Sequence, residues 1–246
     1  MDRVFRSLLM IAVIGVGIAG FMNRGIVWQR IWGSSADIVE VREQVRPDLS
    51  TRLEQSGFQW GAETFIRVFK EERELEVWLR TEETFELFDS YEICNHSGDL
   101  GPKLREGDHQ SPEGLYEVDS AAMNPNSSYH LSFNLGFPNR YDRAHGRSGS
   151  FLMIHGDCVS VGCYAMTDDG IEDIYLIVEA AHQAGQSHVQ VHAFPFEMTN
   201  ERLSKERDNR WYAYWSNLKT GYDLFEANRI PSKVSVFEKR YTFQSF

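Results

Sequence analysis

The chain has 246 residues, of which 42% are hydrophobic and 13% aromatic. This is enough apolar material to bury one sizeable core, and it excludes a disordered protein. A formal net charge of -11 excludes nucleic acid as a partner, because binding a phosphate backbone requires a basic face.

The N-terminus has the charge pattern of an export signal. Arg3 and Arg6 precede an uncharged apolar run from Leu8 to Met22. The run is about 15 residues, shorter than the roughly 20 that cross a bilayer comfortably. A signal peptide over residues 1–22 that is cleaved, and an uncleaved inner-membrane anchor through residues 8–22, both remain open. Either predicts a protein of the periplasm or cell envelope that contacts the membrane only through this segment.

Residues 34–57 are charged, with apolar positions at helical spacing, and predict a helical spacer that Pro47 splits into two short helices. In the residues that follow, apolar and polar side chains nearly alternate, which is typical of antiparallel strands. The expected strands are Thr64 to Lys70, Leu75 to Arg80, Thr84 to Cys94, Leu115 to Val118, Tyr129 to Phe133, Phe151 to Ile154 and His188 to Phe194.

One strong helix is expected from Thr167 to Ala184, where Ile171, Ile174 and Val178 repeat at intervals of three and four. Gly136 to Ser150 is expected to be a long loop. The fold class is therefore α+β and rich in β-structure, a sandwich or barrel over residues 60–195 with this one main helix. Residues 196–246 form a C-terminal extension whose aromatic residues are expected to pack on the sheet.

The segment between the strand at 151–154 and this helix holds the residues suited to chemistry. His155 and Cys163 are flanked by Gly156 and Gly162, so the chain can turn and bring imidazole and thiol together. A base beside a thiol raises its thiolate fraction and activates it as a nucleophile. Gly162 lets the backbone approach a substrate and aim N–H groups at an oxyanion, and Ser160 can add a hydroxyl there. The Gly156 carbonyl can orient the imidazole.

Other readings of the same residues stay open at this level. The His-Cys cluster can be a structural turn or a disulfide partner. A metal site of His155, Cys158 and Cys163 lacks the Cys-x-x-Cys spacing that is typical of zinc. Cys94 and Cys158 can form a disulfide or be two buried free thiols. His192, on an alternating strand, is interpreted as a packed histidine before a ligand or base.

Several separated motifs resemble those of one enzyme family. Ser160 to Met166 is similar to the Ser-His-Gly-Cys-x-Arg-Met signature of the YkuD-type L,D-transpeptidases, and His155-Gly156 resembles their upstream His-Gly. Gly101-Pro102-Lys103 resembles the family's Gly-Pro-Lys, and the segment from Glu106 to Gly114 resembles its Thr-Pro-x-Gly. The similarity runs from about Thr64 to His192 and looks closest to the YafK-like branch.

The resemblance implies a β-rich fold whose cysteine attacks the peptide bond after the third residue, a diamino acid, of a peptidoglycan stem peptide. An acyl-enzyme forms and an amine then takes the acyl group. Carried over by position, Cys163 is the nucleophile, His155 the base and Gly156 the orienting carbonyl. Ser160, Gly162 and the Cys163 amide surround the oxyanion. Neither a metal nor an organic cofactor is implied, and an envelope protein linked to peptidoglycan is a further possible partner.

The chain departs from the family signature at Val161, which replaces the histidine, and at Ala165, which replaces the arginine. The loop before the signature is also short. The carboxylates of the donor then need another partner, for which the expected substrate-binding residues are Lys103, Arg140, Arg143 and Arg147. An amine acceptor gives a transpeptidase, whereas water gives a carboxypeptidase or amidase. A non-catalytic envelope-binding protein with structural cysteines is the alternative of another class.

Overall fold

The computed structural model describes residues 35–244. The predicted export signal or anchor at residues 1–22 lies outside the described residues. Within residues 35–244, no helix combines the length and the apolar composition that crossing a membrane requires.

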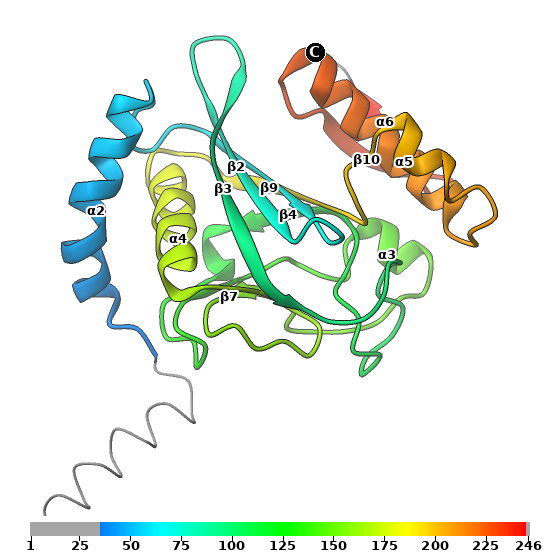
Figure 1. Ribbon diagram of the computed structural model, residues 1–246, viewed down its shortest axis with the longest axis horizontal. Coiled ribbons are helices and arrows are strands. Elements are labelled where there is room, and N and C mark those ends of the chain that lie inside the picture. Colours follow the sequence, from blue (N-terminus) through cyan, green and yellow to red (C-terminus); the bar gives the residue numbers. More distant parts are fainter. Residues whose placement is uncertain (1–34, 245–246) are drawn as a thin grey trace, which may run out of the picture.

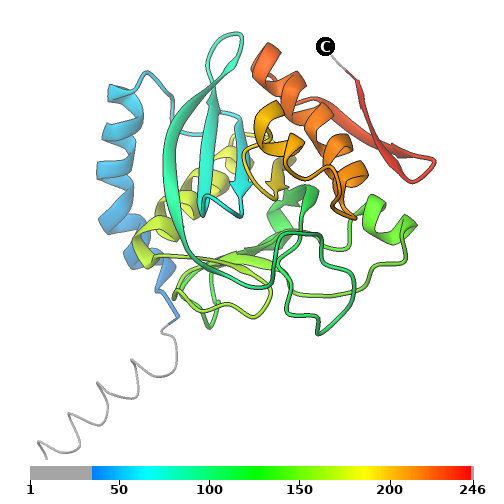
Figure 2. The same cartoon turned by 45° about the vertical axis from the view of Figure 1, so that its right-hand side comes forward.

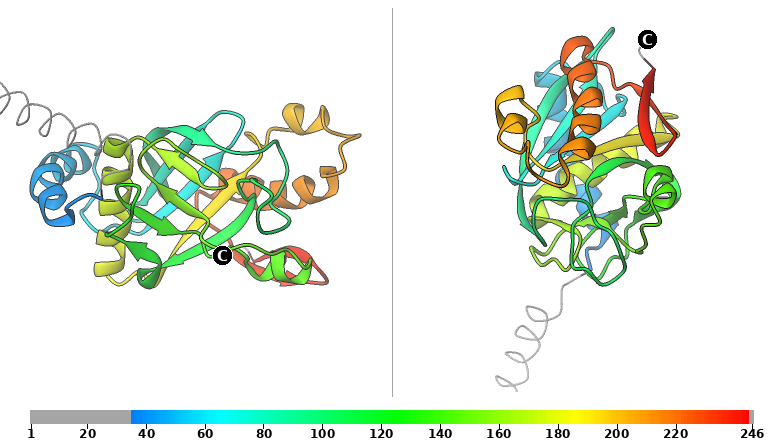
Figure 3. Two further views of the ribbon diagram at one scale, coloured as in Figure 1. Left: turned by 90° about the horizontal axis from the view of Figure 1, so that it is seen from below. Right: turned by 90° about the vertical axis from the view of Figure 1, so that its right-hand side faces the viewer.

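A nine-stranded mixed sheet forms the centre of the molecule, in the order β4-β9-β1-β2-β3-β8-β7-β6-β5. It curves strongly when seen from below (Figure 3). The seven predicted segments each contain part or all of one of these strands, whereas β5 and β8 were not predicted, and the predicted mixed and β-rich fold class is confirmed. Their bounds are β1 Thr64–Phe69, β2 Glu74–Arg80, β3 Phe85–His96, β4 Gly114–Asp119, β5 Met123–Asn124, β6 Ser132–Asn134, β7 Met153–His155, β8 Tyr164–Met166 and β9 His188–Phe194.

Helix α4 (Asp168–Gln183) covers one face of the sheet, and α2 (Ile38–Gln55) lies beside it (Figure 1). The Thr167 side chain accepts a hydrogen bond from Gly170 N and begins α4 where the sequence predicted. Val178 and its apolar neighbours on α4 are buried against Leu49 and Leu53 of α2 and the strands. Hydrophobic burial therefore joins α2 to the main core.

The predicted break at Pro47 is wrong, because α2 is a single helix with Pro47 inside it. An interior proline removes a helical hydrogen bond at a cost of about 3 kcal/mol. Contacts with α4 lie on both sides of Pro47: Arg42 pairs with Glu179 at 2.5 Å, Arg52 pairs with Asp173 at 2.6 Å, and Val41, Leu49 and Leu53 are buried in the core. Tertiary contacts with α4 thus hold the helix together across the proline.

The C-terminal residues cover the other face of the sheet with α5 (Asn200–Ser204), α6 (Tyr212–Asn228) and the hairpin of β10 (Lys233–Phe237) and β11 (Arg240–Gln244). Figure 2 shows α6 and the hairpin together beside the sheet. Trp215, Leu218 and Tyr222 pack with Phe194 in a second apolar cluster. The expectation of one strong C-terminal helix was wrong, because α6 is also long.

A buried arginine joins α6 to the sheet. Arg67 on β1 is 4% exposed and pairs with Glu76 of β2 at 2.6 Å and with Glu226 of α6 at 2.5 Å. Its guanidinium also lies 4.8 Å from the ring centroid of Trp78, a cation–π contact. The expected loop from Gly136 to Ser150 contains one further element, the short helix α3 (Arg140–Ala144).

Candidate active site

The register of two parallel strands brings the predicted nucleophile and base to one face of the sheet. Ile154 of β7 pairs with Tyr164 of β8, and both side chains are buried in the main core. Side chains alternate along a strand, so His155 and the residue before β8, Cys163, lie on the opposite face from that core. The two residues are diagonal neighbours, because Cys163 lies across from Met153, two positions before His155.

Cys163 is the one free cysteine within residues 35–244. The backbone N–H of Met153 donates a hydrogen bond to its Sγ at 3.4 Å, and the thiol lies 3.6 Å from the carbonyl oxygen of Phe151. The start of β7 therefore holds the sulfur in a defined position.

His155 is 3% exposed, and its Nδ1 lies 2.6 Å from the carbonyl oxygen of Gly156. Because a carbonyl oxygen only accepts, Nδ1 carries the proton and Nε2 is left as an acceptor. Burial lowers the pKa of His155 below its ordinary value of 6.5. The imidazole is consequently neutral near pH 7, the state that a general base requires.

Burial raises the pKa of the Cys163 thiol above 9.0, while the Met153 N–H and the positive charge of Lys103 act in the opposite direction. The pair therefore rests as a thiol and a neutral imidazole. Nucleophilic attack from this state requires that His155 take the thiol proton during the reaction.

Gly156 fits its position because no side chain can be accommodated there. Its N–H donates to the carbonyl oxygens of Tyr129 and Leu131, at 3.1 and 3.2 Å. A Cβ atom would lie 2.6 Å from Oδ1 of Asp168 and 3.1 Å from a methyl carbon of Ile171. The close approach of α4 thus requires glycine beside the imidazole, and this fixes the carbonyl that accepts from His155.

Ser160 and Gly162, expected around the oxyanion, brace the backbone of the cysteine. The Ser160 hydroxyl donates to the carbonyl oxygen of Cys163 at 2.8 Å, and the Gly162 N–H donates to the Ser160 hydroxyl at 3.2 Å. Gly162 adopts φ +135°, a conformation that side chains disfavour. Of the three expected donors, the Cys163 N–H is the one with no hydrogen-bond acceptor described within residues 35–244.

A second serine braces the same carbonyl and was not predicted. The Ser111 hydroxyl also donates to the Cys163 carbonyl oxygen at 2.8 Å, across 52 positions of sequence. Its side chain is fully buried. In the sequence, Ser111 stands out only because its Ser-Pro-Glu-Gly segment resembles a family motif. No pattern in the neighbouring residues indicates that this segment contacts the cysteine.

Two of the four cations expected to bind substrate are occupied by structural ion pairs. Lys103 is 4% exposed and lies 2.5 Å from Asp108, close enough to Cys163 to affect the thiol pKa. Arg147 is 8% exposed, pairs with Asp142 at 2.7 Å and has its guanidinium 4.9 Å from the ring centroid of Tyr214.

The other two cations, Arg140 and Arg143, line a cavity of about 360 Å³ between β4, α3, β9 and β10. Its wall includes Tyr116, Val234 and Tyr241, and neither Cys163 nor His155 borders it. The fold thus places these arginines at a separate cavity and does not bring the four cations together.

The remaining cysteines and His192 have structural surroundings. Cys94 and Cys158 form a disulfide, which removes Cys158 from any metal-ligand set. His192 is 2% exposed, with its ring centroid 4.8 Å from that of Phe65 and its Nε2 3.1 Å from Oε1 of Gln190. The interpretation of His192 as a packed histidine is confirmed.

Exposed apolar side chains occur close to the thiol in the sequence and in space. Phe151, whose carbonyl faces the sulfur, is 76% exposed, and Val161, two positions before Cys163, is 73% exposed. The surface beside the nucleophile is therefore apolar where the family signature has a histidine.

Comparison with known proteins shows the family of the chain. Residues 63–184 match the family model YkuD, described as the L,D-transpeptidase catalytic domain. YafK of Escherichia coli K12 is 42% identical over 241 residues, which are 98% of this chain and 90% of YafK, and YafK of strain O157:H7 gives the same values. The chain belongs to the YkuD family.

Two solved structures show more distant similarity. A variant of the helical cell shape determining protein Pgp2 from Campylobacter jejuni aligns with a TM-score of 0.44 and 19% identity, over 72% of this chain and 63% of that one, which is less than two thirds of its length. Bd1075 of Bdellovibrio bacteriovorus aligns with a TM-score of 0.39 and 16% identity, over 74% of this chain and 84% of that one.

Membership of the YkuD family supports a function in peptidoglycan chemistry and confirms the resemblance found in the sequence. The family model ends at residue 184, before α5, α6 and the C-terminal hairpin. YafK matches across these elements as well, because the alignment spans 98% of the chain.

Proposed function

We propose that this YkuD-family protein catalyses acyl transfer on peptidoglycan stem peptides through an acyl-enzyme on Cys163. The observation that carries the proposal is the hydrogen bond from His155 Nδ1 to the Gly156 carbonyl at 2.6 Å. It leaves Nε2 as the acceptor on the strand face that carries the thiol.

The reaction begins with Cys163 as a thiol and His155 as a neutral imidazole that carries its proton on Nδ1. Nε2 of His155 takes the thiol proton while Sγ of Cys163 attacks the carbonyl carbon of the diamino acid, in the peptide bond that joins it to the next residue. The oxygen becomes negative near the Cys163 N–H. His155 then returns its proton to the leaving amine, the C–N bond breaks and a thioester remains. A second amine attacks the thioester and His155 takes its proton; the C–S bond then breaks as the new amide forms, and His155 returns the proton to the sulfur to restore the thiol.

A carbapenem, which acylates an activated thiol, tests the nucleophile. We expect intact-mass spectrometry to show one adduct on the wild-type protein and none on Cys163→Ala. A Cys94→Ser, Cys158→Ser double variant is the matched control and retains the adduct, because it removes the other cysteines and leaves Cys163. An adduct that persists in Cys163→Ala would contradict the assignment of the nucleophile.

Hydrolysis is the second candidate, and the placement of the cations favours it. Lys103 and Arg147 are paired with carboxylates, whereas Arg140 and Arg143 line another cavity. None of these four side chains is thus free beside the thiol, either for the donor carboxylates to which they were assigned or for a carboxylate of an acceptor peptide, whereas water as acceptor needs no such partner. With water as acceptor, His155 takes a proton from the water, which attacks the thioester, and a carboxylate and the thiol are released.

Muropeptides incubated with the protein, with and without an added amine, separate the two candidates. A transpeptidase yields a cross-linked product that requires the amine, whereas a hydrolase yields shortened peptides in both reactions. The hydrolytic reading includes release of an envelope protein linked to peptidoglycan. If neither product nor adduct forms, the non-catalytic alternative, an envelope-binding protein, replaces both.

The proposed substrate supports a location in the cell envelope, where peptidoglycan lies. This agrees with the export pattern of residues 1–22 and the proposed periplasmic location. The proposed substrate-binding role of Arg140 and Arg143 then concerns a part of the peptide that lies away from the scissile bond, in the cavity that they line.

A further inference from the structure

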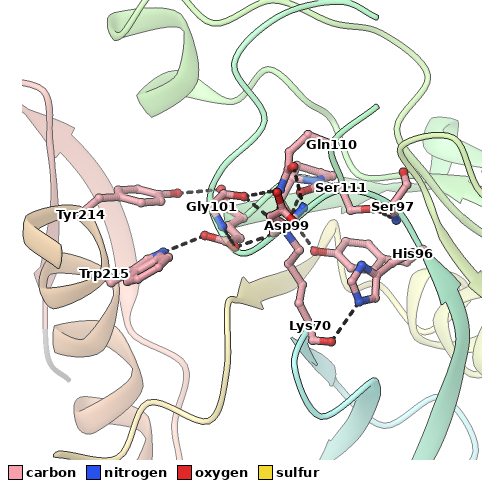
Figure 4. A network of polar contacts seen from close by, with 12 residues as sticks. Lys70, His96, Ser97, Asp99, Gly101, Gln110, Ser111, Tyr214 and Trp215 are labelled. Carbon is pink, nitrogen blue, oxygen red and sulfur yellow. Dashed lines mark hydrogen bonds and ion pairs between the residues drawn. The ribbon is translucent and has the colours of Figure 1, made fainter. Parts of the chain in front are cut away.

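A fully buried ion pair lies beneath the segment that braces the cysteine. Lys70, at the end of β1, and Glu113, just before β4, are both 0% exposed and lie 3.2 Å apart. Nζ of Lys70 also donates to the carbonyl oxygens of Asp99 and Ser111, at 2.9 and 3.1 Å. Figure 4 shows these bonds converging on the lysine. One cation thus holds together several points of the segment from 99 to 113.

The same glutamate is bound by the C-terminal extension. Its Oε2 accepts a hydrogen bond from the indole N–H of Trp215 at 2.8 Å, and its main-chain oxygen accepts one from the Tyr214 hydroxyl at 2.6 Å. Both donors lie on α6, and Figure 4 shows them reaching the network from the side opposite His96. They lie beyond residue 184, where the match to the catalytic-domain model ends.

The residues just before Glu113 contact the nucleophile's backbone. Ser111 donates to the Cys163 carbonyl oxygen at 2.8 Å, and Pro112 accepts from the Tyr164 hydroxyl at 2.6 Å. The three consecutive residues from Ser111 to Glu113 therefore connect α6 on one side to Cys163 and Tyr164 on the other. All of these bonds are at least partly buried, so water does not replace them readily.

We propose that the C-terminal helix α6 positions the nucleophile through this network, with Trp215, Tyr214, Glu113 and Ser111 as positioning residues. The extension is then part of the catalytic unit as well as a cover on the sheet. The effect on rate rests on the proposed acyl transfer, whereas the mechanical connection from α6 to Cys163 does not.

Conservative changes on α6 test the connection. Trp215→Phe and Tyr214→Phe keep the rings and remove one donor each. Tyr212→Phe is the matched control, because the Tyr212 hydroxyl makes no hydrogen bond within residues 35–244. Hydrogen–deuterium exchange of the peptide covering residues 158–166 reports the connection without any substrate. The rate of carbapenem acylation, measured beside the melting temperature, reports the consequence for the thiol.

We expect each α6 variant to raise exchange in residues 158–166 about threefold and to slow acylation about fivefold, the effect of one lost hydrogen bond. Tyr212→Phe should change neither. Ser111→Ala removes the last bond of the network and should slow acylation to a similar extent, even if an α6 variant does not fold.

Unchanged exchange and acylation in the folded variants would show that the network only stabilises the fold, and would overturn the proposal. Increased exchange with unchanged acylation would overturn the positioning role. If the wild-type protein is not acylated, the proposed function fails, and the exchange measurement still decides whether α6 holds the Cys163 segment.

Discussion

At the scale of single residues, the reacting pair is kept neutral by burial. The pKa of His155 is lowered and that of Cys163 is raised, and in each case loss of solvent is the largest cause. Many cysteine nucleophiles rest as a thiolate beside an imidazolium, but here neither charge is favoured. Proton transfer therefore accompanies attack, and the thiol is protected from indiscriminate reaction at neutral pH.

The pH dependence of alkylation checks this state. With its pKa above 9.0, Cys163 forms little thiolate at pH 7, so we expect its reaction with iodoacetamide to accelerate continuously from pH 7 through pH 9. Cys163→Ala is the control, since Cys94 and Cys158 form a disulfide and contribute no thiol. A rate that is already constant below pH 7 would indicate a low-pKa thiolate and contradict the neutral pair.

At the scale of elements, the connection between β7 and β8 is anchored at several points. The Cys94–Cys158 disulfide ties it to β3, Gly156 packs against α4, and Ser160 folds back on the Cys163 carbonyl. The disulfide reaches another strand, Gly156 contacts a helix, and the bond of Ser160 lies within the connection itself. The short connection, residues 156–163, can hold the cysteine although none of its residues belongs to a strand.

Removal of the disulfide should cost substantial stability. The bond closes a separation of 64 residues, for which the loss of unfolded-state entropy corresponds to about 4 kcal/mol. The Cys94→Ser, Cys158→Ser variant should show this decrease in the free energy of unfolding by urea titration. Dithiothreitol should lower the urea midpoint of the wild-type protein and leave that of the variant unchanged; equal sensitivity of both would refute the structural role.

At the scale of the whole molecule, apolar clusters on both faces of the sheet bury polar groups that titrate. The clearest case is His192 on β9, enclosed by Phe65 and Phe194, where burial lowers the imidazole pKa to about 3. The His192 imidazole is thus protonated readily in the unfolded chain, where its pKa is near 6.5, and only with difficulty in the folded protein. Folding stability consequently falls as the pH drops from 6.5 towards 3.

The His192→Gln variant should remove this part of the acid sensitivity. Between pH 7 and pH 5 the wild-type protein should lose about 2 kcal/mol more unfolding free energy than the variant, the value expected for an imidazole that charges only when unfolded. Urea unfolding at both pH values measures the difference. His188→Gln, at an exposed histidine of the same strand, should behave like the wild type, and the same pH difference in all three proteins would contradict the prediction.

Much of the fold could be predicted where the pattern is local. Alternation identified β1, β2 and β9, and the spacing of apolar residues with the Thr167 cap identified α4. Local rules failed at Pro47, where contacts with α4 keep α2 helical although the proline removes a helical hydrogen bond. They also failed for α6, whose aromatic residues were read only as material that packs on the sheet.

In the candidate site, too, some residues could be predicted from neighbouring positions in the sequence and others only from the fold. His155, Gly156 and Cys163 are close in the chain, so their residue types and glycine flanks suggested a nucleophile and its base beside a structural turn or a disulfide, and the order of the family motifs favoured the nucleophile. Residue order also determined the family. Only the fold decided that Arg140 and Arg143 line a separate cavity, and that Lys70, Ser111 and Trp215 support the cysteine. The physical reason is that these contacts join positions 41 to 102 residues apart, and the curvature of the sheet, which no short pattern encodes, brings them together.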